Sequence, residues 1–176
     1  MALLLKATAF AAEKHRSQRR KDSAASPYIN HPIALADLLA NAGGVADVDV
    51  LCAALLHDTI EDTDTTPQEL RNEFGARIEM IVAEVTDDKA LPKDVRKQLQ
   101  VERAPYASPE AKLVKLADKI CNLRDMVEAP PHGWSGQRKR EYFEWAARVV
   151  DGLRGAHPYL EQVFDEQYSR GLLEIG

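Results

Sequence analysis

Cysteine is scarce in this sequence, with two residues among 176, Cys52 and Cys121. Both lie within apolar stretches of helical pattern, and neither has the spacing of a zinc ribbon. We therefore expect reduced core cysteines and a cytoplasmic protein, since intracellular thiols are kept reduced.

The sequence also lacks a long apolar run. No stretch approaches the roughly 18 uninterrupted apolar residues that a membrane helix requires. The first twelve residues, M-A-L-L-L-K-A-T-A-F-A-A, have no basic region ahead of the apolar ones, and Lys6 interrupts them. This pattern is not typical of a signal peptide. We expect an ordinary first helix and no membrane association.

An excess of basic charge is absent as well. The 23 lysines and arginines are outnumbered by 28 acidic residues, for a net charge of −5. Such a balance argues against general nucleic-acid binding, and we expect no nucleic-acid partner. A small polyanionic ligand is still compatible with it if the binding site is locally basic. The basic clusters at residues 19–21 and 138–140 are therefore of interest.

What the sequence does contain is a helical pattern along its whole length. Hydrophobic residues make up 45% of the chain and charged residues 29%, which is typical of a soluble domain with a core. The apolar positions recur at helical spacing, and no segment has the pattern of a strand, a repeat or a linker. We predict an all-α fold, a single domain over residues 1–176 with roughly eight to ten helices.

The most informative stretch is residues 51–64, L-C-A-A-L-L-H-D-T-I-E-D-T-D. Six apolar residues lead directly to His57 and Asp58. Glu61 follows His57 by four positions, and Asp62 follows Asp58 by four positions. Charged groups beside an apolar helix are costly unless they are paired or bound to a cation, so this pattern suggests a metal site. Adjacent ligands can share one ion only if the helix ends there.

A structural interpretation of the same stretch is equally open. His57 could be a core histidine, and Asp58 could cap the next helix while the later acids are solvated. If the last turn continues instead, Glu61 and Asp62 lie over His57 and Asp58 and can act on a water.

Two further segments offer ligands of the same type. His31 lies at the start of a predicted helix, where Asn30 or His31 is expected near the N-cap. Asp118 adjoins the apolar stripe of a helix that begins at Ser108, with Asn122 one turn later. A salt bridge from Asp118 to Lys115 is the structural alternative. If His31, His57, Asp58 and Asp118 converge, the mixed imidazole and carboxylate set suits Mn²⁺ or Fe²⁺.

These motifs resemble a known family. His…His-Asp…Asp in an all-helical chain is similar to the HD superfamily of metal-dependent phosphohydrolases. The segments P-Y-I-N-H-P, A-A-L-L-H-D-T-I-E-D-T and K-L-V-K-L-A-D-K-I-C-N-L-R-D resemble the hydrolase domain of RelA/SpoT proteins. P-P-H-G-W-S and R-E-Y-F-E-W-A-A-R-V-V resemble the small alarmone hydrolases typified by the metazoan SpoT homologue. The resemblance covers nearly the whole chain.

The resemblance implies an HD-type helical bundle that hydrolyses (p)ppGpp with Mn²⁺, releasing pyrophosphate and leaving GDP or GTP. It also implies the roles of individual residues. The expected metal ligands are His31, His57, Asp58 and Asp118, and the residues expected to position or deprotonate the attacking water are Glu61 and Asp62. Substrate contacts are expected from Arg20 and Lys21 on guanine, Asn122 on the nucleoside, and Arg138 and Tyr142 on phosphate. Asp125 stands where long RelA/SpoT proteins often carry threonine, and it has no assigned role.

Two other functions fit the same residues. One is removal of the 2′-phosphate of NADPH at the same metal site, because both substrates present ribose phosphates to a basic cleft. The other is a catalytically silent nucleotide-binding module, which the presence of Glu61 and Asp62 disfavours. The residues predict neither the oligomeric state nor the regulation.

Overall fold

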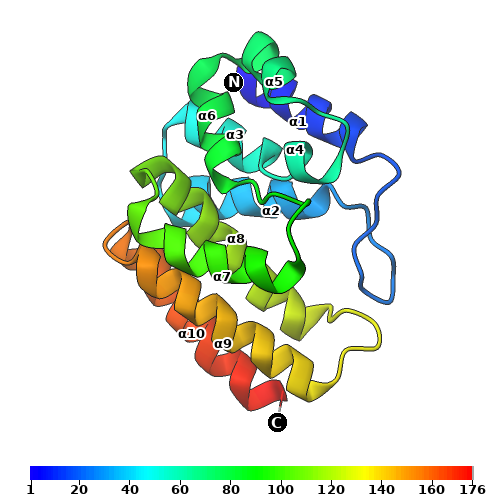
Figure 1. Ribbon diagram of the computed structural model, residues 1–176, viewed down its shortest axis with the longest axis vertical. Helices are drawn as coiled ribbons and strands as arrows, with labels where there is room; N and C mark the ends of the chain where they lie inside the picture. Colours follow the sequence, from blue (N-terminus) through cyan, green and yellow to red (C-terminus); the bar gives the residue numbers. More distant parts are fainter. Residues whose placement is uncertain (176) are drawn as a thin grey trace.

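The computed structural model describes residues 1–175, and in this part of the chain the regular structure is entirely helical (Figure 1). The α-helices are α1 (Ala2–Lys14), α2 (Asn30–Asp37), α3 (Val48–Leu56), α4 (Thr59–Asp62), α5 (Pro67–Phe74), α6 (Ala76–Val85), α7 (Lys93–Arg103), α8 (Pro109–Glu128), α9 (Gly136–Leu153) and α10 (Pro158–Ile175). A π-helical turn, Leu38–Ala42, extends α2, and a 3₁₀ turn, Ala104–Tyr106, follows α7. The predicted all-α class and approximate number of helices are confirmed.

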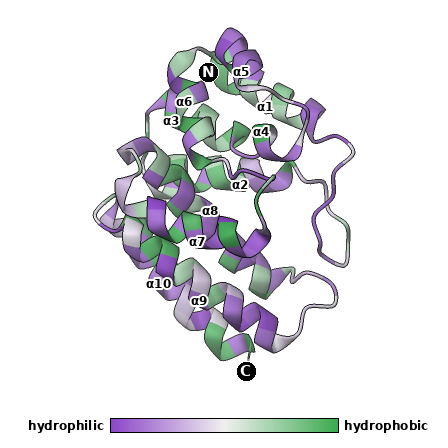
Figure 2. Ribbon diagram, in the orientation of Figure 1, coloured by the Kyte–Doolittle hydropathy of each residue, from purple (hydrophilic) through white to green (hydrophobic). Residues whose placement is uncertain are grey.

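The core is centred on α3, whose residues from Val50 to its C-terminus are all buried. It packs against α1, α2, α6 and α8. A helix surrounded in this way needs apolar residues on every side, which is why its sequence, V-D-V-L-C-A-A-L-L, becomes apolar throughout after the first turn. Figure 2 shows the contrast with α5 and α9, whose ribbons include many hydrophilic residues.

The long helix α8 connects the two parts of the bundle. It contacts α2, α3 and α6 on one side and α9 and α10 on the other, with α7 packed on α9 (Figure 1). Ser108 caps α8 by accepting a hydrogen bond from the amide of Ala111 at 3.1 Å, and Pro109 follows as the first helical residue. The predicted start of this helix is therefore confirmed.

The helix ends follow most of the local signals in the sequence. Thr66 accepts a hydrogen bond from the amide of Glu69 at 3.1 Å at the start of α5, and Gly75, with φ of +90°, separates α5 from α6. The expected start of α2 is confirmed: Ile29 is the N-cap, and Asn30 and His31 follow it as the first helical residues. This places His31 inside the first turn with its side chain buried. None of the helices in residues 1–175 has the length and apolar character needed to span a membrane.

Candidate metal centre and its cleft

His57 lies where α3 ends, directly after Leu56, and Asp58 precedes the short helix α4. The Nδ1 atom of His57 is 2.9 Å from the carbonyl oxygen of Ala54, which makes Nδ1 the protonated nitrogen. Its Nε2 atom is buried and lies 3.0 Å from Asp58 Oδ2 and 3.9 Å from Asp118 Oδ1. This nitrogen can offer its lone pair to a cation, which takes the place of a proton there.

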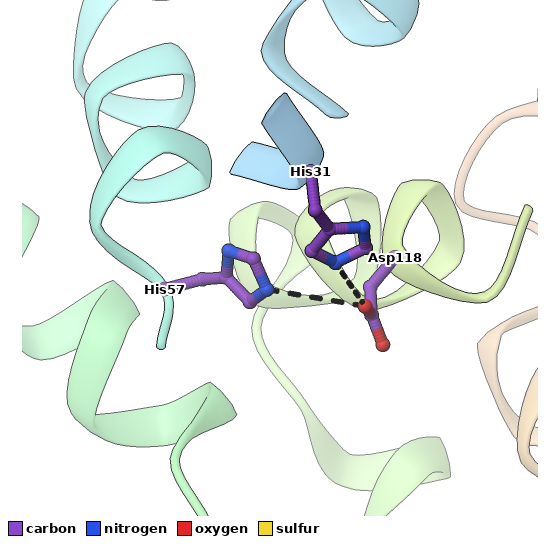
Figure 3. Close-up of side chains that lie close together, drawn as sticks. All are labelled: His31, His57 and Asp118. Atoms are coloured by element: carbon purple, nitrogen blue, oxygen red, sulfur yellow. Dashed lines mark hydrogen bonds and ion pairs between the residues drawn. The ribbon is translucent and has the colours of Figure 1, made fainter. Parts of the chain in front are cut away.

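His31 from α2 and Asp118 from α8 meet His57 at this point (Figure 3). His31 Nε2 is 3.1 Å from Asp118 Oδ1, and the ligand atoms of the three residues lie within 4.8 Å of one another. Both imidazoles are almost fully buried, at 4% and 6% exposure. Two imidazole nitrogens and a carboxylate oxygen converging in this way form a donor set that suits a transition-metal ion. We call His31, His57 and Asp118 the ligand trio.

Asp58 lies beside the ligand trio but is not part of it. Its Oδ2 atom is 3.0 Å from His57 Nε2, and the same oxygen accepts a hydrogen bond from the hydroxyl of Tyr28. Asp58 therefore lies next to the converging ligand atoms, and its carboxylate is already oriented by the hydroxyl of Tyr28.

Burial and neighbouring charges act in opposite directions on the pKa values of His57, Asp58 and Asp118. Burial alone would lower the pKa of His57, but the neighbouring Asp58 and Asp118 carboxylates raise it to about 9. Burial likewise opposes ionisation of both aspartates, yet the surrounding cationic groups hold the pKa of each well below its usual range. Two partly buried ionised carboxylates therefore adjoin two buried imidazoles, which is an environment that favours a divalent cation.

Asp118 has two further partners on α8. Lys119, itself buried, places its Nζ 3.0 Å from Asp118 Oδ2, and the amide of Asn122 donates to Asp118 Oδ1 at 2.7 Å. The alternative pairing of Asp118 with Lys115 is wrong, because Lys115 Nζ instead donates to the carbonyl oxygen of Val85 at 3.2 Å. The carboxylate of Asp118 is thus oriented on both oxygens.

The two acids expected to act on water lie near the ligand trio without joining it. Glu61 Oε2 accepts a hydrogen bond from the amide of Asp87 at 3.1 Å, and Glu61 Oε1 is 3.3 Å from Arg96 Nη1. Burial raises the pKa of Glu61. Asp62 forms an ion pair with Lys89 and lines the adjoining cleft. Both carboxylates are therefore paired in this structure.

A cleft of about 820 Å³ lies next to the metal centre and includes His31 in its lining. Its lining is formed mainly by the α1–α2 loop, α8 and the residues before α9, and includes Arg20, Lys21, Asn122, Asp125, Trp134 and Tyr142. Arg20 forms an ion pair with Asp125, and its guanidinium carbon lies 5.8 Å from the ring centroid of Tyr28. The cleft thus combines positive charge with aromatic surface, which suits a nucleotide.

A smaller hollow of about 330 Å³ adjoins this cleft and shares Lys21, Trp134 and Tyr142 with it. We call it the basic annex, because its lining also includes Lys93, Arg96, Lys97 and Arg138. The guanidinium carbon of Arg138 lies 4.1 Å from the ring centroid of Trp134. All five expected substrate-contact residues therefore lie around the cleft and the annex.

A family model described as HD domain matches residues 7–144 of the chain, a segment that includes the whole ligand trio. The chain belongs to the HD-domain family. The predicted resemblance to the HD superfamily is confirmed.

This HD-domain protein is similar along nearly all of its length to curated proteins named guanosine-3′,5′-bis(diphosphate) 3′-pyrophosphohydrolase MESH1. It is 58% identical to the Homo sapiens protein, covering 97% of this chain and 96% of the relative. Its identity with the Drosophila melanogaster protein is 49%, covering 93% and 92%. A solved structure, described as a metazoan orthologue of SpoT that hydrolyses ppGpp and has a role in starvation responses, superposes with a TM-score of 0.94 at 47% identity. That superposition covers 98% of this chain and 97% of the other.

Several residues of the HD-domain site were not expected from the sequence. They are Tyr28 beside Asp58, Lys119 beside Asp118, Lys89 beside Asp62 and Trp134 in the cleft wall. Lys119 was detectable in principle, because it lies next to Asp118 in the sequence and a lysine buried among apolar residues requires an acidic partner. Tyr28 and Lys89 act across distant parts of the chain, and no local spacing indicates their partners.

Proposed function

We propose that this chain is a metal-dependent phosphohydrolase that removes the 3′-pyrophosphate of (p)ppGpp. The observation that carries the proposal is the convergence of His31, His57 and Asp118 at a cleft lined with cations and aromatic rings. The names of relatives that match nearly the full chain support the choice of substrate. Hydrolysis forms a bond from water oxygen to phosphorus and breaks the bond from phosphorus to the ribose 3′ oxygen, which leaves as a hydroxyl.

Mn²⁺ is the proposed cofactor. Imidazole and carboxylate donors that leave coordination positions open suit this ion, whereas a structural zinc ion prefers a closed tetrahedral set rich in thiolates. The proposed ligands are the trio together with Asp58, which lies 3.0 Å from His57 Nε2. When bound, such an ion lowers the pKa of water and polarises phosphoryl oxygens. Lys119 and Asn122 would keep the Asp118 carboxylate in one orientation through their contacts at 3.0 and 2.7 Å.

Glu61 and Asp62 are the proposed acids for the attacking water. A general base works best when its pKa lies near the working pH, and burial moves the pKa of Glu61 upward in that direction. Lys89 would have to release Asp62 before this carboxylate could accept a proton, because the two form an ion pair here. The backbone amide of Asp87 donates a hydrogen bond to the Glu61 carboxylate and keeps it in position.

We assign different residues of the cleft and the basic annex to the different parts of the nucleotide. Arg20 is planar and can stack on guanine, while Lys21 supplies a point charge at the boundary between cleft and annex. Asn122, whose amide donates to Asp118 Oδ1, is the proposed contact to the nucleoside. Arg138 and Tyr142 line the annex, where the local positive charge compensates for the net charge of −5 of the chain.

The test is a pyrophosphate-release assay with purified protein, ppGpp and Mn²⁺, repeated after the metal is removed with a chelator. We expect release only with the metal, and loss of release in Asp118→Ala. Asp64→Asn is the matched control, since the Asp64 side chain is 87% exposed and faces Lys14. Full activity in Asp118→Ala would contradict the assigned metal site.

The same assay with NADPH separates the alternative substrate. Release of inorganic phosphate from NADPH at a higher kcat/KM than that of pyrophosphate from ppGpp would transfer the proposed function to the 2′-phosphatase. Tight binding of ppGpp by calorimetry without turnover of either compound would instead indicate a silent nucleotide-binding module.

A further inference from the structure

The loop between α1 and α2, residues 15–29, connects the cleft with the metal centre. It carries Arg20 at the cleft, and its two ends are bonded to each other, since the amide of Tyr28 donates to the carbonyl oxygen of Gln18 at 3.2 Å. The side-chain amide of Gln18 donates to the carbonyl oxygen of Asp62 at 2.5 Å. The loop is thus attached to the chain segment that holds Asp58 and Asp62.

Tyr28 is the point where these attachments meet. Its hydroxyl donates a hydrogen bond to Asp58 Oδ2, and its ring lies 5.8 Å from the guanidinium carbon of Arg20. The ring is supported from behind by buried His15, with ring centroids 4.8 Å apart. His15 in turn is 2.7 Å from the side-chain oxygen of Gln18. The tyrosine is therefore held by packing on one side and by a directed bond on the other.

We propose that Tyr28 is a positioning residue of the metal centre. Its hydroxyl orients the Asp58 carboxylate, and its ring supports the guanidinium group of Arg20 in the substrate cleft through a cation–π contact. The inference deepens the proposed function and rests on its metal site. It assigns a role to a residue of P-Y-I-N-H-P in addition to His31.

The rotational freedom of the Asp58 carboxylate affects how tightly it can hold a metal ion. An aspartate side chain can rotate, and a metal ligand that must be ordered on binding loses affinity through that entropy. Donors behind a ligand remove this cost, and their loss typically weakens metal binding about 10- to 100-fold. For Asp118, the donors behind the carboxylate are Lys119 and Asn122. For Asp58 the donor that approaches from outside the ligand trio is the hydroxyl of Tyr28.

The decisive variant is Tyr28→Phe, which removes the hydroxyl and keeps the ring that packs on His15 and under Arg20. Titration of metal-free protein with Mn²⁺ by calorimetry should give a Kd that is about 10- to 100-fold higher than in the parent protein. At saturating Mn²⁺ the KM for ppGpp should change less than twofold. Tyr168→Phe, which removes a phenol hydroxyl on α10 beside Phe143 and Phe164, should leave the Mn²⁺ affinity unchanged.

A second variant, Tyr28→Leu, separates the hydroxyl from the ring. It should weaken Mn²⁺ binding as much as Tyr28→Phe and should in addition raise the KM for ppGpp, because Arg20 loses its aromatic support. Far-ultraviolet circular dichroism of the metal-free proteins verifies that both variants fold. Unchanged Mn²⁺ affinity in folded Tyr28→Phe, or weakening in Tyr28→Leu alone, would overturn the inference.

These outcomes are independent of the substrate. A parent protein that binds Mn²⁺ but releases no pyrophosphate from ppGpp would refute the proposed function, and the comparison of Mn²⁺ affinities would still decide the role of Tyr28. A parent protein that binds no Mn²⁺ would refute the metal site and the inference together.

Discussion

At the scale of single residues, each carboxylate in or next to the candidate metal centre has a directed partner. Asp118 is paired with Lys119, Asp58 with Tyr28, Asp62 with Lys89, and Glu61 with Arg96. Removing one partner of a buried charge leaves the other uncompensated, which is strongly destabilising. Substitutions at this site must therefore be read by separate measurements of folding, metal binding and turnover.

Glu61→Gln keeps the size of the side chain and removes its basicity. If Glu61 acts on the attacking water, kcat for ppGpp should fall about 10²- to 10⁴-fold, while the Mn²⁺ affinity should stay within a few-fold of the parent value. Turnover and calorimetric titration on the same preparation check this. Parallel losses of kcat and Mn²⁺ affinity would instead place Glu61 among the metal ligands. Asp64→Asn, in the same acidic stretch, is the control and should change neither quantity.

At the scale of elements, the position of α8 depends on close contacts at both of its faces. On one side α8 meets α2, α3 and α6, and on the other it meets α9 and α10. The approach of α10 is close at Gly171, where an added Cβ would lie 2.1 Å from Cε1 of Phe143 on α9 and 3.3 Å from Cγ2 of Val127 on α8. Glycine at this position therefore determines how near the three helices come.

Gly171→Ala should lower the free energy of unfolding by about 1–3 kcal/mol, because a buried methyl group would displace the Phe143 ring. Chemical denaturation followed by circular dichroism measures this change. Gly136→Ala is the matched control, since a Cβ there meets nothing closer than the carbonyl oxygen of Ile175 at 3.5 Å. That variant should stay within about 1 kcal/mol of the parent protein. Equal stabilities of the two variants would contradict the close packing.

A second contact between elements lies at the far end of the bundle from the cleft residues of α8. Arg77, in the first turn of α6, is 2.6 Å from Asp47 Oδ2, 2.8 Å from Asp49 Oδ2 and 3.1 Å from Glu110 Oε1. It thereby joins the starts of α3, α6 and α8. The hydrogen bond from Arg77 lowers the pKa of Asp47 from 3.8, and the Glu110 backbone amide, followed by Arg77, lowers the pKa of Glu110 from 4.5.

A lowered pKa in the folded state means that these carboxylates stabilise the fold above their unfolded pKa values and lose that effect as the pH falls through the folded values. Arg77→Gln should therefore reduce Tm at pH 7, and the difference from the parent protein should shrink between pH 4.5 and strongly acidic pH. Thermal unfolding across this range tests the expectation. Arg16→Gln, which breaks an exposed pair with Glu13, should have little effect at any pH. A pH-independent difference for Arg77→Gln would refute the electrostatic explanation.

At the scale of the whole molecule, the ligand trio connects three helices that are far apart in sequence. His31 belongs to α2, His57 follows α3, and Asp118 belongs to α8. A cation bound by all three would hold the α2–α3 layer against the long helix that also carries α9 and α10. Metal binding at this site would therefore be coupled to global stability.

Mn²⁺ at about 100 times its Kd should add about 2.7 kcal/mol to the free energy of unfolding, which corresponds to an increase in Tm of about 5–10 °C. Thermal unfolding with Mn²⁺ and with chelator measures this difference. Asp118→Ala should unfold at the same temperature in both conditions. A rise in Tm of equal size in that variant would show that the ion binds elsewhere.

The helices themselves could largely be derived from local sequence. Ser108 and Pro109 before an apolar stripe determine the start of α8, and Thr66, Pro67 and Glu69 determine the start of α5. These signals work because caps and helical periodicity involve residues within one or two turns of each other. The end of α3 at His57 and Asp58, with two adjacent ligand-type residues, was predictable for the same reason.

Partners across the fold were decided only by tertiary structure. Spacing along α8 allowed Asp118 to pair with Lys115, but the packing of α8 against α6 directs Lys115 to the carbonyl of Val85 and leaves Lys119 for the aspartate. Arg20 and Asp125 are 105 residues apart, and Tyr28 and Asp58 are 30 apart. Contacts of this kind depend on how whole helices and loops are placed relative to one another. The sequence by itself thus determined the helices and the ligand types, whereas their convergence and the orientation of each carboxylate came from packing.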